Sequence, residues 1–263
     1  MPFFQQLYFL EKGQSTDVNL LFLHGGGGNH QLWDHQVKFF ERNFGVTLLD
    51  LPGHGKSAAY KPLRDIPVSV KALDKLLNQV YSERANVLIG HSYAGYVLMG
   101  LLKTPSPSLR GLVFLDCPAS FDLDIIRNQV QFAQKRLKLS PKDLEKATKE
   151  SFLRMMGKNL PEDEKNKILA ALAQVDLNWY YSIMAKREEM IPPLQMKSRC
   201  FVNIPILIIE AQYGGSGHPD QSYRKIFDKF SYHVIPKTHH FCFLEKPEIV
   251  NSCILEFIDE INI

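Results

Sequence analysis

The sequence lacks several features that would point to particular classes of protein. None of its uninterrupted apolar runs approaches the length of a membrane-spanning helix. The apolar N-terminal stretch MPFFQQLYFL has neither a basic region nor a small-residue cleavage site, so it does not resemble a signal peptide. The four cysteines contain no C-x-x-C pair and no metal-ligand spacing. We therefore expect a soluble, cytoplasmic protein with reduced thiols and with no metal or organic cofactor.

Excess charge of one sign is also nearly absent. The formal net charge is +3 over 263 residues, which is too small to indicate nucleic acid or a membrane surface as a partner. The hydrophobic fraction of 45% is typical of a globular protein. A chain of this length can bury a sizeable core, and α/β folds of this size often form one domain with an insertion.

Short apolar runs alternate with amphipathic stretches along most of the chain. This alternation predicts an α/β fold with a mostly parallel sheet and helices on both of its faces. The predicted strands are residues 18–23, 45–50, 86–90, 111–116, 204–210 and 231–236. The predicted core helices are residues 31–42, 68–83, 93–104, 220–230 and 246–260.

The stretch from about residue 120 to residue 200 shows no convincing strand. Ser140-Pro141 and Pro161 are typical helix starts there, and Pro192-Pro193 ends the last helical pattern. The expected helices are 122–138, 141–157, 161–175 and 177–190. We therefore expect a core in two parts, 1–119 and 201–263, interrupted by a helical cap over 120–200. Residues 122–200 hold 15 Lys and Arg against 11 Asp and Glu, so the excess positive charge lies in the cap.

The segment Gly90-His91-Ser92-Tyr93-Ala94-Gly95 lies between an apolar strand and an apolar helix. This is the strand–turn–helix context of the G-x-S-x-G nucleophile elbow, with Ala94 in the place of the last glycine. Such a turn exposes the Ser92 hydroxyl at the edge of the sheet. It also places the Tyr93 N–H at a helix N-terminus, where it can stabilise an oxyanion.

A glycine-rich stretch, His24 to Gly28, directly follows the first predicted strand. Glycines allow backbone amides to approach a ligand closely, and in a hydrolase Gly26 would provide the second oxyanion N–H. A phosphate-binding loop is the competing interpretation, but neither the Walker spacing nor the dinucleotide spacing is present. The run DLPGHGKS, residues 50–57, follows the next strand and is interpreted as a structural turn.

The segment Lys237-Thr238-His239-His240-Phe241 follows the last predicted strand. A histidine near the C-terminus is where a general base lies when the chain order is Ser, acid, His. His239 and His240 both satisfy this condition.

Together these motifs resemble the α/β-hydrolase superfamily. HGGGGNHQLW, DLPGHGKS, GHSYAG and HHFCFLEKP occur in its order and spacing, over residues 1–118 and 203–263. Members commonly end with a Gly-His-Phe segment, and this alignment assigns the base to His240 rather than His239. The resemblance also implies a cap after the sixth strand and substrate contacts at Gly25 and Trp33.

The acid that would orient His240 departs from the family pattern. Members usually place it in a G-x-x-D segment after the seventh strand, where this chain has Ala211-Gln212-Tyr213-Gly214. Asp116, at the end of the sixth strand, is the first candidate, because some lipases take their acid from this position. Glu210 and Asp220 are the alternatives.

The residues favour a serine hydrolase that cleaves a carboxylic ester or thioester through an acyl-enzyme on Ser92. The glycine loop with Trp33 also resembles that of the biotin-pathway esterases that demethylate a pimeloyl carrier-protein ester. That resemblance implies an acidic acyl carrier protein as a partner at the basic cap. Two alternatives stay open: a carbon–carbon bond hydrolase or lyase using the same site, and a non-catalytic ligand-binding relative that lost its acid at Gly214.

Overall fold

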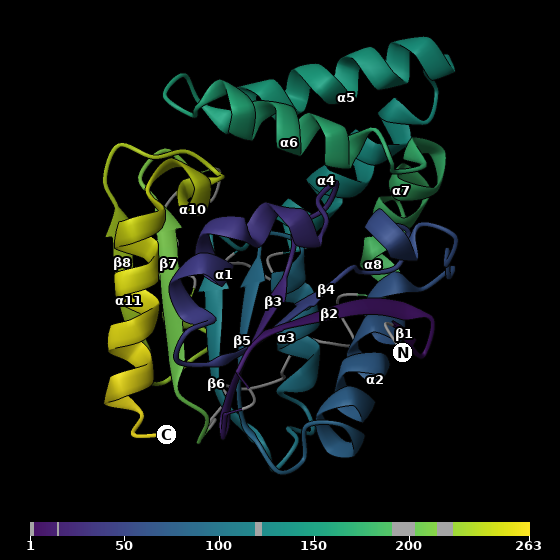
Figure 1. Ribbon diagram of the computed structural model, residues 1–263. Coiled ribbons are helices and arrows are strands. Elements are labelled where there is room, and N and C mark those ends of the chain that lie inside the picture. The colour runs from purple at the N-terminus through teal and green to yellow at the C-terminus, as the bar shows by residue number, and fades with distance from the viewer. Residues whose placement is uncertain (1–2, 15, 119–122, 191–202, 215–222) are drawn as a thin grey trace.

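The computed structural model describes residues 3–14, 16–118, 123–190, 203–214 and 223–263. Eight strands form one sheet in the order β1-β2-β4-β3-β5-β6-β7-β8 (Figure 1). The pairs β1–β2 and β2–β4 are antiparallel, and the other pairs are parallel. The strands are β1 (Phe3–Phe4), β2 (Leu7–Gly13), β3 (Val18–Leu23), β4 (Gly45–Leu49), β5 (Ala85–His91), β6 (Leu109–Leu115), β7 (Ile206–Ala211) and β8 (Ser231–Ile235).

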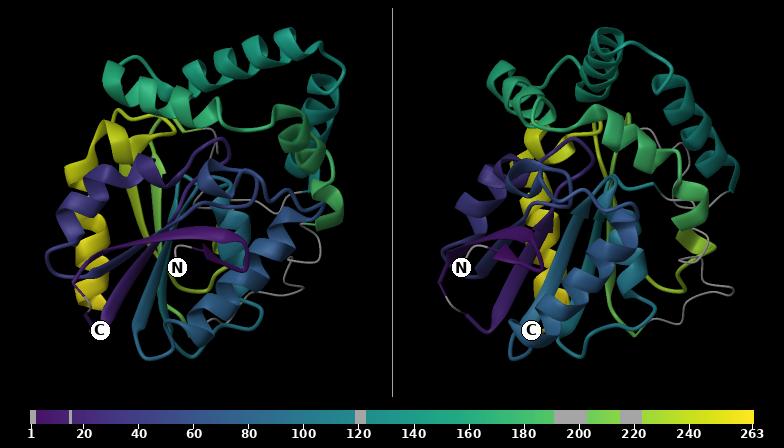
Figure 2. Two further views of the ribbon diagram at one scale, coloured as in Figure 1. Left: turned by 45° about the vertical axis from the view of Figure 1, so that its right-hand side comes forward. Right: turned by 90° about the vertical axis from the view of Figure 1, so that its right-hand side faces the viewer.

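The hydrophobic core consists of two layers, one on each face of the sheet, and Figure 2 shows helices on both faces. Helices α2 (Asp65–Gln79) and α3 (Ala94–Leu101) cover one face, and α1 (Asp34–Phe40) and α11 (Pro247–Glu260) cover the other. In β3, Leu21 and Leu23 face the first layer, whereas Leu20 and Phe22 face the second. Successive strand residues point to opposite faces, so a strand covered on both sides must be apolar throughout.

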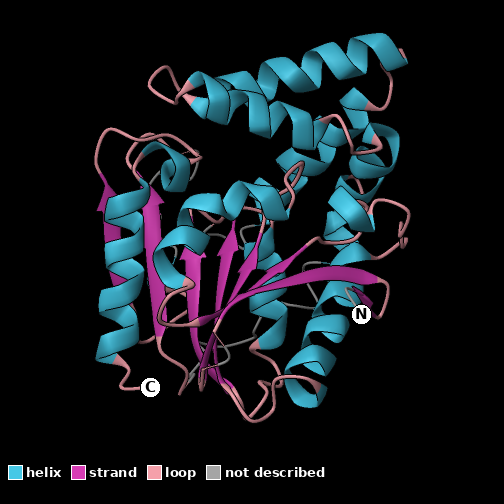
Figure 3. Ribbon diagram, in the orientation of Figure 1, coloured by secondary structure: helices cyan, strands magenta, loops and turns pink. Residues whose placement is uncertain are grey.

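Between β6 and β7 the described residues form five helices, of which α5 and α6 lie beyond the carboxyl ends of the parallel strands (Figure 3). Ser140 caps α5 by accepting a hydrogen bond from the Asp143 N–H, and Asp176 caps α7 by accepting one from the Trp179 N–H. The helices are α4 (Leu123–Arg136), α5 (Pro141–Met156), α6 (Glu162–Leu172), α7 (Leu177–Met184) and α8 (Arg187–Met190). We call α4–α8 the helical insertion. The predicted boundaries at 119/120 and 200/201 lie outside the described residues and stay predictions.

Several elements differ from the sequence-based expectation. Strands β1 and β2 were not predicted, because β2 has only a short apolar run before its polar end and pairs antiparallel near the edge of the sheet. The helix predicted over 220–230 lies partly outside the described residues, and residues 225–230 are not helical. The helix predicted over 177–190 is divided into α7 and α8. Short turns also occur at η1 (His30–Trp33), η2 (Gly55–Ser57) and α10 (Cys242–Glu245). In the described part of the chain, every helix is too short or too polar to cross a membrane.

The loops after β3 and β4 are joined by the buried carboxylate of Asp50. Its Oδ1 accepts hydrogen bonds from the His30 N–H at 2.7 Å and from His30 Nδ1 at 2.9 Å. Its Oδ2 accepts the Lys56 N–H at 2.8 Å. Burial alone would raise the pKa of Asp50, but the hydrogen bonds from His30 and the neighbouring histidines outweigh it and lower the pKa. Asp50 therefore fixes the glycine-rich stretch that begins at His24 against the turn at residues 50–57.

We expect Asp50→Asn to lower the free energy of unfolding by about 1.5–3 kcal/mol, because charge-assisted hydrogen bonds are lost. The folded-state pKa of Asp50 is lowered, so its stabilisation is present above the unfolded pKa and disappears as the pH falls through the folded value. Urea titrations from neutral pH to about pH 3 should show the difference between wild type and variant shrinking below about pH 4. The exposed Asp259→Asn variant is the control, and an equal loss in both variants would contradict this role.

Candidate active site

Ser92 lies in the turn between β5 and α3, in a conformation that non-glycine residues rarely adopt. Its φ is +51°. The turn is held by the Ser92 N–H, which donates to the Leu115 carbonyl, and by the Gly95 N–H, which donates to the Ser92 carbonyl. A Cβ at Gly90 would lie 2.8 Å from Leu98 Cδ1, so a larger residue there would require the Leu98 side chain to move. The small residues around Ser92 thus permit the strained turn that presents its hydroxyl to the pocket.

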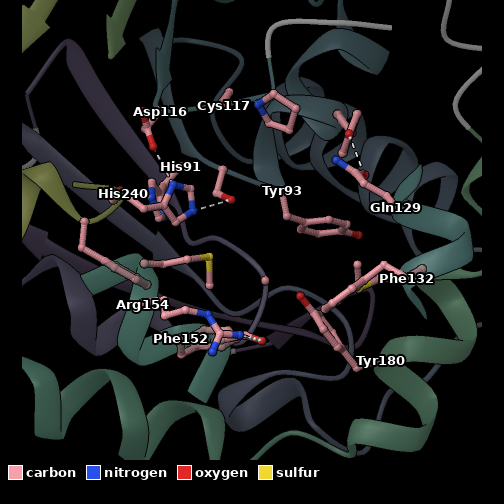
Figure 4. A pocket seen from close by; sticks show the side chains of 18 of the residues that line it. His91, Tyr93, Asp116, Cys117, Gln129, Phe132, Phe152, Arg154, Tyr180 and His240 are labelled. Carbon is pink, nitrogen blue, oxygen red and sulfur yellow. Dashed lines mark hydrogen bonds and ion pairs between the residues drawn. The ribbon is translucent and has the colours of Figure 1, made fainter. Parts of the chain in front are cut away.

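His240 approaches Ser92 from the loop after β8, far away in the sequence. Its Nε2 lies 2.9 Å from Ser92 Oγ, and its Nδ1 lies 2.5 Å from Asp116 Oδ2 (Figure 4). With Nδ1 carrying the proton shared with the carboxylate, Nε2 is free to accept the Ser92 proton. His239 points elsewhere: its N–H donates to Glu245 Oε1, and its ring packs beside Tyr213.

Asp116 follows β6 directly and is held by two backbone groups of the neighbouring strand β7. Its N–H donates to the Ile209 carbonyl at 2.7 Å, and its Oδ1 accepts the Ala211 N–H at 3.0 Å. Burial alone would raise the pKa of Asp116, but the hydrogen bond and the electrostatic attraction of His240 outweigh it and lower the pKa. The carboxylate is therefore ionised and fixed in orientation beside His240.

Gly214 makes room for this carboxylate. A Cβ built on Gly214 would overlap both carboxylate oxygens of Asp116. The loop after β7, where the family usually has its acid, thus has a glycine because the Asp116 side chain fills that space from β6. Gly214 stands where the family usually has its acid, and Asp116 on β6 places its carboxylate in the space that Gly214 leaves.

Glu210 and Asp220 were the two alternatives to Asp116 as the acid. Glu210, in β7, is 1% exposed and is not among the residues that line the pocket, and the Nδ1 of His240 is already engaged by Asp116. Asp220 lies outside the described residues. Of the two candidates that the structure describes, Asp116 is therefore the one that contacts His240.

The two residues expected to provide oxyanion N–H groups lie in the wall of the pocket that Ser92 also lines. Gly26 and Tyr93 both line the pocket, and among the described residues neither N–H donates a hydrogen bond. Two buried histidines hold the loop that contains Gly26. His24 Nε2 accepts the Leu51 N–H at 3.0 Å, and His54 Nε2 accepts the Gly27 N–H at 3.0 Å. These contacts agree with the structural interpretation of residues 50–57.

A cavity of about 600 Å³ lies between the sheet edge and the helical insertion. The insertion contributes Phe132, Phe152, Met155, Tyr180 and Met184 to its wall, which gives the wall a largely apolar character (Figure 4). These residues had no recognisable sequence signal. Their helices were expected, but the faces they turn toward Ser92 depend on how the insertion packs on the core.

The substrate contact expected at Trp33 is wrong. The Trp33 side chain is fully buried and packs between Phe22 and Phe243, with ring centroids 5.1 and 4.5 Å away, and it does not line the cavity. It is a core residue because its helical turn, η1, faces the sheet. Gly25 lies beneath the wall rather than in it, and a Cβ there would lie 3.0 Å from Ser92 Cβ. Because Gly25 has no side chain, the loop can pass close to Ser92. Gly25 itself offers no surface to the substrate.

His91 is a part of the site that the sequence did not single out. Its Nε2–H donates to the His240 carbonyl at 2.9 Å, and its ring lies 4.6 Å from the His240 ring. Burial, together with the neighbouring His240, lowers the pKa of His91 to about 3. His91 is thus a neutral donor that fixes the backbone of His240. Within the described residues, no group of three His, Cys, Asp or Glu side chains is placed to hold a metal ion.

Comparisons with curated proteins give partial matches. Protein ABHD8 of Homo sapiens is 40% identical over 84 residues, which are 31% of this chain and 19% of that protein. The pimeloyl-[acyl-carrier protein] methyl ester esterase of Wigglesworthia glossinidia brevipalpis is 28% identical over 107 residues, which are 41% of this chain and 39% of that protein. The chain thus spans about a fifth of one relative and two fifths of the other.

Comparisons with solved structures cover nearly the whole chain. A thermophilic esterase from Thermogutta terrifontis aligns at a TM-score of 0.74 and 22% identity, with 98% of this chain and 94% of that chain covered. MenH from S. aureus aligns at a TM-score of 0.79 and 19% identity, with 98% and 99% covered. At these identities the likeness shows the fold alone.

The family model described as the alpha/beta hydrolase family matches residues 20–252, which include Ser92, Asp116 and His240. This match, together with the eight-stranded sheet and the expected helices on both of its faces, confirms the fold that the motifs predicted. The chain belongs to the alpha/beta hydrolase family.

Proposed function

We propose that this protein is a serine hydrolase that cleaves a carboxylic ester or thioester through an acyl-enzyme on Ser92. The observation that carries the proposal is the continuous hydrogen-bonded line from Asp116 through His240 to Ser92 at the wall of an apolar cavity. The esterases among the relatives, which match part of the chain, support the same reaction class.

In the first half of the reaction, His240 Nε2 takes the proton of Ser92 as Oγ attacks the carbonyl carbon of the ester. The carbonyl oxygen becomes an oxyanion, which the Gly26 and Tyr93 N–H groups stabilise. When this intermediate collapses, the bond to the leaving oxygen breaks, and the proton on His240 passes to the departing alcohol. Asp116 stabilises the imidazolium while it carries that proton.

In the second half, a water molecule replaces the alcohol. His240 takes one of its protons as the water oxygen attacks the acyl carbon, and the same two N–H groups stabilise the second oxyanion. Collapse returns the proton to Ser92 Oγ and releases the carboxylic acid. Every proton is transferred by His240, so no other titratable group is needed.

Two other functions remain candidates for the same pocket. A carbon–carbon bond hydrolase or a lyase would use the same three side chains on a different substrate, and panels of β-diketones and cyanohydrins would distinguish these from an esterase. A non-catalytic ligand-binding relative was suggested by the missing acid at Gly214. The position of the Asp116 carboxylate in that space removes its main support.

An acidic acyl carrier protein is a second proposal, for a partner that presents the ester. Four basic residues and no acidic ones lie between Lys135 and Lys142, at the junction of α4 and α5. Three of them, Lys135, Lys138 and Lys142, are exposed. The partial match to carrier-protein esterases motivates this choice of partner.

Ser92→Ala should lower kcat for ester hydrolysis by about 10⁴-fold or more, because it removes the hydroxyl that lies against His240 Nε2. The measurement is release of para-nitrophenol from para-nitrophenyl butyrate, combined with fluorophosphonate labelling and mass spectrometry of the labelled peptide. The exposed Ser82→Ala variant is the control and should keep the wild-type rate. Full activity of Ser92→Ala, or labelling at another serine, would refute the mechanism.

Asp116→Asn should lower kcat by about 10⁴-fold, because the amide cannot stabilise the protonated His240 and favours the wrong tautomer. Steady-state kinetics on the same ester measure the effect. Glu210→Gln, which changes the alternative acid, is the matched control and should retain activity. A large fall in kcat in Glu210→Gln with normal kcat in Asp116→Asn would show that the acid was assigned wrongly.

Gly214→Ala provides an independent check on Asp116, because the added Cβ displaces the carboxylate without removing it. In the wild-type background the change should reduce kcat. In the Asp116→Asn background it should have little further effect, since coupled residues are not additive. Additive losses would mean that Gly214 acts through something other than Asp116.

Turnover of a carrier-protein-bound methyl half-ester should fall as salt is raised to about 0.5 M NaCl, because salt screens the attraction between the basic α4–α5 junction and an acidic protein. A Lys135→Glu/Lys138→Glu variant should show the same loss at low salt. Both should leave para-nitrophenyl butyrate turnover unchanged. Salt-insensitive turnover of the carrier-bound ester would exclude docking at this surface.

A further inference from the structure

Arg187 is a buried cation in the wall of the active-site cavity. It is the first residue of α8, and only 6% of it is exposed. Its Nη1 donates to Gln129 Oε1 at 2.8 Å, and Gln129 also accepts the Tyr96 hydroxyl at 3.2 Å. The guanidinium lies 5.5 Å from the ring centroid of Tyr93 and 5.4 Å from that of Tyr96. The side chain is thus fixed beside Tyr93, the neighbour of Ser92.

The hydrogen-bond donors of this guanidinium are only partly used among the described residues. Nη1 donates to Gln129, whereas the buried Nε has no hydrogen-bond partner. The charge of Arg187 acts on Asp65, which lines a small neighbouring pocket together with it and accepts the Tyr93 hydroxyl. Burial nevertheless raises the pKa of Asp65. A buried donor without a partner is costly, so a functional reason for it is expected.

The other titratable groups on the cavity wall offer no carboxylate to Arg187 Nε. Asp116 is engaged by His240, and the pKa of about 3 leaves His91 neutral. Burial raises the pKa of Tyr180 to about 12, so that hydroxyl is also neutral. The remaining charged residue of the wall is a second cation, Arg154, which is exposed. The cavity therefore combines an apolar wall with a guanidinium whose Nε has no hydrogen-bond partner.

We propose that Arg187, positioned by Gln129, binds a carboxylate that the substrate carries in addition to its scissile ester. The substrate class is a half-ester, in which an apolar spacer separates the ester from the carboxylate. This inference rests on the proposed ester hydrolysis at Ser92 and narrows it. It is an alternative to the carrier-bound methyl ester, whose second carboxyl group is held as a thioester and leaves no free carboxylate. The apolar wall formed by Phe132, Phe152 and Met184 would contact the spacer.

Guanidinium chemistry favours this ligand over a purely structural role. Arginine offers a planar set of donors that matches a carboxylate with two parallel hydrogen bonds, whereas Gln129 uses only Nη1. A residue needed only to fill space beside Tyr93 and Tyr96 would be replaceable by an uncharged side chain of similar size. Arg187→Met tests this difference directly, because it keeps much of the volume and removes the charge.

The experiment compares para-nitrophenyl half-esters of the dicarboxylic acids from succinate to pimelate with uncharged para-nitrophenyl alkanoates of matched length. Wild type should show a kcat/KM at least about tenfold higher for one or more half-esters than for the matched alkanoate. Arg187→Met should lose that preference, measured within the variant as the ratio of kcat/KM for a half-ester to kcat/KM for the matched alkanoate. The adjacent exposed residue provides the matched control, since Lys186→Met removes the same charge from the surface and should keep the preference.

The outcomes separate this inference from the proposed function. Turnover of the alkanoates with no preference for any half-ester overturns the role of Arg187 but leaves the hydrolase intact. An equal loss on both substrate series in Arg187→Met, with unchanged melting temperature, also overturns it. Absence of turnover on all esters, together with no labelling of Ser92, refutes the hydrolase itself.

Inhibition of the wild-type protein provides a test that does not depend on folding of a variant. Straight-chain carboxylates should inhibit alkanoate hydrolysis competitively, with inhibition constants at least about tenfold lower than those of the amides of equal length. Arg187→Lys should weaken this discrimination, because an ammonium retains the charge but not the planar donors. Equal inhibition by acids and amides would overturn the proposal.

Discussion

The contact between the Asp116 carboxylate and His240 Nδ1 is the interaction on which the candidate site depends. Asp116 is fixed by backbone hydrogen bonds to β7, and His240 by contacts with His91 and with the Met155 carbonyl of the helical insertion. Ser92 meets the other side of the imidazole. One hydrogen-bonded line thus joins the ends of β5 and β6, the loop after β8 and helix α5. If Asp116 moved, the orientation of the imidazole would be lost, and with it the proposed proton transfer.

This line explains why small residues occur where they do. Gly90 permits the strained turn at Ser92, Gly25 permits the loop to approach Ser92, and Gly214 leaves space for Asp116. The buried histidines His24 and His54 then hold the Gly26 loop, and the lowered pKa values of both keep them neutral hydrogen-bonding groups. The core is therefore rigid at the reacting atoms. The helical insertion supplies the apolar wall and the buried cation, Arg187, that would select the substrate.

Much of the fold could be predicted from the sequence because each parallel strand is buried on both faces and so forms a continuous apolar run. The antiparallel β2 lacked that signal, since its second half is exposed, and it was missed. Ser92 and His240 were recognisable because a tight turn before a helix restricts its residue types and because His240 aligns with a family segment. Trp33 was misassigned because an aromatic residue after a glycine loop has the same sequence pattern whether its turn faces the core or the cavity.

The sequence by itself determined the α/β architecture, the elbow at Ser92 and the Gly26 loop, because these depend on local geometry and on hydrophobic period. The choice of His240 over His239 came from the family resemblance of the segment around it. The sequence left the acid among Asp116, Glu210 and Asp220. Only the tertiary structure decided that Asp116 reaches His240 and that Gly214 makes space for it, since the contact joins two strands separated by the whole helical insertion. The burial of Arg187 beside Tyr93 is of the same kind. A charge near an active site is a property of how helices pack, and no local pattern in the chain encodes it.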